Sequence, residues 1–161
     1  MKKIISTLQK VQILIGGIFL AIFLVTVVWQ MLARYMGIAA TWTEDVSMYS
    51  FIWSVFMGAA AMVYEKRHFA FTSISDALKN QKAKTMLSIL ISAIMLIFAI
   101  LMIIYGWKVT KQFWNYTWIT IPKFKRGPVW CCLQLCGVTS SIYLIFGIFE
   151  DIAALGKGGA K

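Results

Sequence analysis

Three charged side chains lie close together in the segment MLARYMGIAATWTEDVSMYSFIW (31–53): Arg34, Glu44 and Asp45. Carboxylates in the first turn of a helix meet the positive end of the helix dipole, and an arginine in a last turn meets the negative end. An arginine can also hold a carboxylate through two parallel hydrogen bonds. We therefore expect Thr43 to cap a second helix and Arg34 to contact one of the acids, closing a helical hairpin.

The cysteines and the single histidine also have reactive or metal-binding chemistry. Cys131, Cys132 and Cys136 lack the C-x-x-C spacing of metal and redox sites, and His68 lies in a different segment. Packing by small, polarisable side chains is the favoured interpretation of the cysteines. We expect no catalytic residue, no metal site and no bound cofactor in this chain.

The segments that position these residues are too apolar for a soluble domain. Of the 161 residues, 60% are hydrophobic and 14% charged, whereas soluble domains have about 45–50% apolar and about 25% charged residues. Uncharged runs with their flanking residues occupy 11–34, 44–64, 86–107 and 128–150, each long enough to cross a ~30 Å hydrocarbon core as a helix. The sequence predicts an all-α integral membrane protein with one four-helix domain over residues 1–161.

The first apolar run is longer than the hydrophobic region of a signal peptide, so we expect a retained helix. Lys and Arg residues are more numerous beside the N-terminus, the second loop and the C-terminus than in the other two loops, which places both termini in the cytoplasm. The net charge is +10, and the basic residues flank the spans. Anionic lipids are therefore favoured as partners over nucleic acid. Phe71, Ile74 and Leu78 have helical spacing, which predicts a short amphipathic cytoplasmic helix between helices two and three.

Small residues form one stripe along the second helix, at steps of three and four. They are Ser47, Ser50, Ser54, Gly58 and Ala61. Such a stripe allows close approach of another helix. The sequence leaves open whether that helix comes from this chain or from a different subunit.

The third loop combines aromatic and basic residues, which are common at membrane interfaces. A docking surface for an acidic soluble partner on the outer side is the functional alternative. Its candidates are Lys108, Lys111, Trp114, Trp118, Lys123, Lys125 and Arg126.

The interiors of the four expected spans contain no Asp, Glu, Lys, Arg, His or Pro. Transporters usually place such residues at their solute or ion sites, so we expect this chain to hold or orient another component. Two alternatives remain: a stand-alone small exporter, which would need a membrane-embedded carboxylate, and a four-helix thiol oxidoreductase, which would need pairs of loop cysteines.

Three motifs occur in order: RYMG (34–37), TWTED (41–45) and FIWSVFMGAAAMVYEKRHF (51–69). With them the chain resembles the DctQ-like family, the small membrane subunit of tripartite ATP-independent periplasmic (TRAP) transporters. The resemblance covers all four helices, with its specific motifs in 34–68. The chain departs from the family at Asp45, where Glu is usual, and at Thr72, where the family has a carboxylate.

The resemblance implies an importer in the bacterial inner membrane with three parts: a periplasmic protein that binds an organic acid, a large membrane subunit with the substrate and sodium sites, and this small subunit. The small subunit would pack on the large one as a scaffold and help to dock the binding protein. Sialic acid and C4-dicarboxylates are the implied cargo classes. The expected structural or subunit-interface residues are Arg34, Tyr35, Trp42, Glu44, Asp45, Ser47, Ser50, Ser54, Gly58 and His68.

Overall fold

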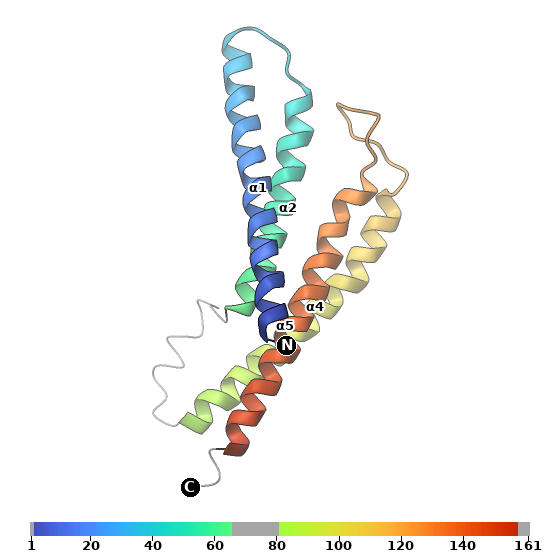
Figure 1. The fold of residues 1–161 in the computed structure, drawn as a ribbon. Helices are drawn as coiled ribbons and strands as arrows, with labels where there is room; N and C mark the ends of the chain where they lie inside the picture. Colours follow the sequence, from blue (N-terminus) through green and yellow to red (C-terminus); the bar gives the residue numbers. More distant parts are fainter. Residues whose placement is uncertain (1, 66–80, 158–161) are drawn as a thin grey trace.

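The computed structural model describes residues 2–65 and 81–157, which form long helices (Figure 1). Within these ranges, four helices are long and apolar enough to cross a membrane. The elements are α1 (Lys2–Tyr35), α2 (Trp42–Tyr64), α4 (Gln81–Phe113), the short 3-10 helix η1 (Gly127–Trp130) and α5 (Cys131–Lys157). The chain is an all-α, multi-pass membrane protein, which confirms the predicted fold class. The amphipathic helix expected after α2, and His68 with it, falls outside the described residues.

The helices are longer than the uncharged runs that predict them. α1 has 34 residues and α4 has 33, so each measures roughly 50 Å at about 1.5 Å per residue, more than the ~30 Å hydrocarbon core. Lysine and glutamine are good helix formers, and the helices continue through such residues at their ends. An uncharged run therefore marks the lipid-buried part of a helix and not its limits.

The four long helices form two antiparallel hairpins, α1 with α2 and α4 with α5 (Figure 1). The hairpins meet where α2 packs against α5. From this contact they diverge toward one end of the bundle, as Figure 1 shows. We call this end, which carries the α1–α2 joint (36–41) and the 114–126 loop, the loop end. Because the helices of the two hairpins are apart at the loop end, contacts between the hairpins there are made by a loop and not by helix packing.

A glycine in the α1–α2 joint terminates α1. Gly37 has φ 70°, a left-handed conformation that glycine adopts without steric cost. The Ile38 N–H donates to the Ala33 carbonyl (2.9 Å) and the Gly37 N–H to the Arg34 carbonyl (3.3 Å). This pair of hydrogen bonds is a Schellman motif, which satisfies the last carbonyls of α1 and turns the chain toward α2.

Small residues bring the helices of each hairpin together. A Cβ atom at Gly16 of α1 would lie 3.3 Å from Met57 Cβ of α2. A Cβ at Gly137 of α5 would lie 2.9 Å from the Ala99 carbonyl oxygen of α4. Lipid offers little hydrophobic drive for helix association, so close backbone approach supplies the packing energy.

Replacing Gly137 with alanine should destabilise the α4–α5 hairpin, because the new methyl group would meet the backbone carbonyl of Ala99. We expect a loss of about 1–3 kcal/mol, the usual cost of overpacking, measured as a lower unfolding temperature in detergent. Gly17→Ala is the matched control, since nothing lies within 4 Å of a Cβ there. Equal unfolding temperatures for the two variants would contradict the close approach.

Candidate functional site

Asp45 is a buried carboxylate at the loop end, in the first turn of α2. Its side chain is 3% exposed. Its Oδ2 atom accepts hydrogen bonds from the backbone N–H (2.7 Å) and the hydroxyl (2.6 Å) of Thr120. Hydrogen bonds to a charged group contribute about 1.5–3 kcal/mol each, and the α2 dipole also favours a negative charge here. Asp45 therefore ties the first hairpin to the loop that joins α4 to η1.

An aromatic stack continues this contact. The Tyr49 ring, one turn after Asp45, has its centroid 4.7 Å from that of Trp118, and Trp118 lies 5.3 Å from Phe124. The Arg126 guanidinium and the Asp45 carboxylate are both close enough to the Tyr49 hydroxyl to interact with it electrostatically. Stacked aromatic pairs contribute about 0.5–1.5 kcal/mol beyond their buried area. We call Asp45, Tyr49, Trp118, Thr120 and Arg126 the Asp45 clamp.

The 114–126 loop is itself held in shape by backbone hydrogen bonds. The Trp118 N–H donates to the Phe124 carbonyl (2.9 Å) and the Arg126 N–H to the Tyr116 carbonyl (2.8 Å). The Trp118 indole N–H also donates to the Lys125 carbonyl (3.2 Å). These bonds fold the loop back on itself, which places Thr120 near its tip and lets it reach α2.

Two expectations for the joint are wrong. Thr43 is not the N-cap of α2, because the helix starts at Trp42, two residues earlier than expected, and Thr41 takes the N-cap position. The Thr43 hydroxyl instead donates to the Ala40 carbonyl (2.6 Å). Arg34 forms no ion pair with Glu44 or Asp45 within the described ranges. Glu44 and Asp45 do lie in the first turn, as expected. The Asp45 carboxylate turns toward Thr120, a partner far away in the sequence.

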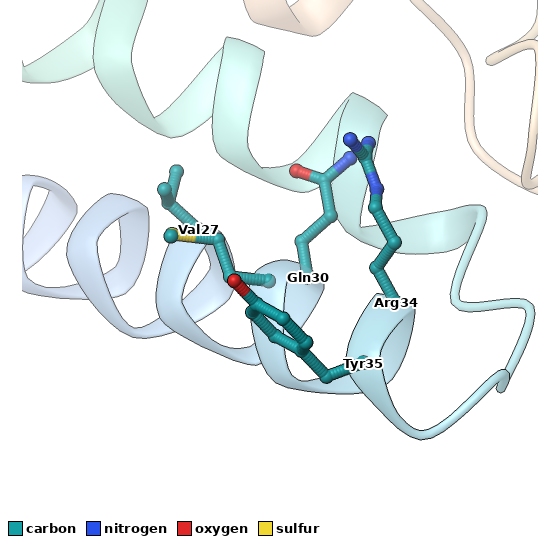
Figure 2. Close-up of a pocket in the computed structure, with 5 residues that line it drawn as sticks. Val27, Gln30, Arg34 and Tyr35 are labelled. Atoms are coloured by element: carbon teal, nitrogen blue, oxygen red, sulfur yellow. The ribbon is translucent and has the colours of Figure 1, made fainter.

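Arg34 instead lines a groove on α1 at the loop end, with a volume of about 370 Å³. Its lining residues recur at helical spacing on one face of α1: Val27, Gln30, Met31, Arg34 and Tyr35. Figure 2 shows the Gln30 and Arg34 side chains extending to the same side, with the Tyr35 ring lying back along the helix. We call this feature the Arg34 groove. Trp42 and Glu44, also expected at an interface, are exposed nearby.

A second polar cluster, which was not expected from the sequence, lies toward the other end of α1. The Gln12 amide donates to the Thr139 hydroxyl (2.8 Å), and the Tyr143 hydroxyl donates to the Gln12 carbonyl oxygen (2.5 Å). Gln9 donates to the Ala61 carbonyl (3.4 Å) and to the Glu65 carboxylate (3.0 Å). These bonds connect α1 with α2 and α5. Two glutamines three apart at the edge of an apolar run were the available signal.

The small-residue stripe of α2 packs within the chain along much of its length. Ser47, Ser50 and Ala61 are buried. Ser54 and Gly58 are half-buried, and their backbone atoms would lie 3.5 Å and 3.6 Å from a Cβ at Gly16 of α1. The chain's own helices thus use the stripe, which was one of the two alternatives left open.

The basic and aromatic residues of the third loop divide into two groups. Lys108, Lys111, Trp114, Lys123 and Lys125 are exposed. Trp118 and Arg126 are half-buried and take part in the Asp45 clamp instead. The exposed lysines form a basic surface at the loop end. The Asp45 clamp holds the loop that carries two of them, Lys123 and Lys125.

Comparison with known families identifies the setting of these features. Residues 23–154 match the model of the family described as tripartite ATP-independent periplasmic transporters, DctQ component. The chain belongs to the DctQ family. This confirms the resemblance drawn from the motifs and makes the chain the small permease component of a TRAP transporter. A comparison with curated proteins found no match.

The family match includes both the Asp45 clamp and the Arg34 groove of this DctQ chain, whereas Gln9 and Gln12 precede it. The DctQ family is a transporter component, in line with the expectation that the chain is not an enzyme. Its three cysteines are free thiols: Cys132 and Cys136 are buried and Cys131 is half-buried. Among the described residues, no group of His, Cys, Asp and Glu side chains is arranged to hold a metal ion.

Replacing Asp45 with alanine should release the 114–126 loop, because Thr120 would lose both of its hydrogen bonds to the carboxylate. We expect trypsin to cleave at Lys123 or Lys125 at least about tenfold faster, since local opening costs less free energy. Glu44→Ala is the matched control, as it removes an exposed acid from the same turn. If both variants were cleaved at the same rate, the clamp would not hold the loop.

Proposed function

We propose that this DctQ subunit acts as a scaffold for the large membrane subunit and carries no solute site of its own. The supporting observation is that two buried polar side chains between its hairpins, Gln12 and Asp45, are bound by other side chains of the chain. Gln12 binds Thr139 and Tyr143, and Asp45 binds Thr120. Solute sites in membranes need polar groups that face a cavity, whereas these groups connect helices to one another or to the 114–126 loop.

The outer faces of α1 and α4 are the surfaces available to the large subunit and to lipid. Both carry large apolar side chains that this chain leaves exposed, among them Leu14 and Val25 of α1 and Ile97 and Phe98 of α4. The two faces belong to different hairpins. We propose that one of them packs against the large subunit and the other contacts the bilayer, so that the complex becomes wider in the membrane.

The exposed basic surface at the loop end supports a role in docking the substrate-binding protein. Lys123 and Lys125 belong to a loop that the Asp45 clamp holds in place, so their charges have a defined position. An acidic patch on the binding protein would be steered to such a surface. This role requires the loop end to face the periplasm and both termini to face the cytoplasm across the bacterial inner membrane, where anionic lipids surround the basic flanks.

The cargo of the complete transporter is proposed to be an organic acid, of the sialic acid or C4-dicarboxylate class, imported with sodium. Its binding sites, including those for sodium, are assigned to the large subunit and to the binding protein.

Reconstituted alone into vesicles, this chain should give no uptake of organic acid. Vesicles with the large subunit, the binding protein and a sodium gradient should take it up, and omission of the small subunit should reduce uptake strongly. Radiolabelled sialic acid and succinate are suitable probes, with collapse of the sodium gradient as the control. Solute flux through this chain alone would contradict the scaffold role.

The double substitution Lys123→Glu/Lys125→Glu should weaken association with the binding protein, because it reverses two exposed charges on the clamped loop. We expect a loss of about tenfold or more in association rate at low salt, and a smaller loss at high salt as screening increases. Surface plasmon resonance on the reconstituted complex measures both. Lys3→Glu/Lys10→Glu is the control, since these exposed lysines lie toward the opposite end of α1, and an equal loss there would argue against docking at the loop end.

A further inference from the structure

The Arg34 groove is polar at its rim and apolar below. Arg34 and Tyr35 belong to the last turn of α1, and Gln30 lies one turn before Arg34. Met31 and Val27 line the groove one and two turns before Tyr35, toward the middle of the membrane-spanning helix. Figure 2 shows Gln30 and Arg34 presenting their polar ends on the same side of the helix. A ligand that fills this groove has an anionic end and an apolar end.

The charge of Arg34 has no partner within the described ranges: no hydrogen bond or ion pair of its guanidinium occurs there. Asp45 is occupied by Thr120. A guanidinium presents N–H groups in a planar fork that matches two oxygens of a phosphate. The rim is therefore complementary to a phosphate group, with the Gln30 amide as a further donor.

Exposed apolar side chains of α1 next to the groove enlarge its apolar surface. Leu24 and Val28 are each 55% exposed and lie on the same helix at the depth of Val27. A soluble anion would contact only the rim and would leave this apolar surface in place. A lipid chain would lie along it.

We propose that the Arg34 groove binds an anionic phospholipid, with its phosphodiester on Arg34 and Gln30 and an acyl chain beside Met31 and Val27. This assignment does not depend on the transport role of the chain. It gives Arg34 a function that neither helix capping nor hairpin closure supplies.

Native mass spectrometry of the full-length chain in detergent, titrated with dioleoylphosphatidylglycerol, tests the site. Arg34→Ala should lower the affinity for the first bound lipid by about tenfold, the usual effect of one lost charge-assisted hydrogen bond, and Arg34→Lys should lower it less. Lys108→Ala is the matched control, because it removes an exposed cation at the same end, from α4, where Lys108 lies over the Tyr105 ring. Its lipid affinity should stay within about twofold of the wild type.

Three results would overturn the proposal. Equal losses for Arg34→Ala and Lys108→Ala would mean that lipid binds by diffuse charge attraction. Displacement of the lipid by millimolar inorganic phosphate would mean that the rim alone is the site, for a free anion. Unchanged lipid binding by Arg34→Ala together with loss of copurification with the large subunit would assign Arg34 to a carboxylate of that protein. Thermal unfolding of each variant checks that the helices remain folded.

Discussion

A polar group buried in a bilayer must find its partner inside the protein, because lipid offers no hydrogen bonds. Among the described residues, two contacts between the hairpins show this constraint. At the loop end the Asp45 carboxylate finds Thr120, and toward the other end of α1 the Gln12 amide finds Thr139 and Tyr143. Both sets of bonds join one hairpin to the other, through a loop at the loop end and through helices toward the other end. The few buried polar side chains therefore decide how two otherwise apolar hairpins are held together.

The two sets of contacts differ in what they position. The Gln12 cluster joins helices directly and fixes where α1 meets α5. The Asp45 clamp joins a helix to a loop, and through that loop it fixes a basic surface at the loop end. Both properties suit the proposed scaffold role, which calls for a bundle that keeps its shape against a larger partner and for a surface whose charges keep fixed positions for a soluble partner.

Composition and uncharged runs were sufficient to predict four membrane-crossing helices, since the length of a helix in lipid is set by the bilayer. The family followed from short motifs around Arg34 and Trp42. The partner of Asp45 was not predictable in this way, because Thr120 is 75 residues away and only the folded loop brings it to α2. Arg34 was the partner expected for the acids because the end of α1 and the start of α2 are close together in the sequence. Gln9 and Gln12 were missed because uncharged residues do not interrupt an apolar run.

The separation between Asp45 and Thr120 also has a meaning for synthesis. Asp45 enters the membrane surface with the second helix, whereas its partner emerges only after 75 further residues, roughly 4–15 s later at about 5–20 residues per second. During that interval the first hairpin exists without this contact, and the Asp45 carboxylate has only water or its own hairpin as a partner. The bond between α2 and the 114–126 loop can form only after α4 has been synthesised, so the loop end takes its final arrangement late.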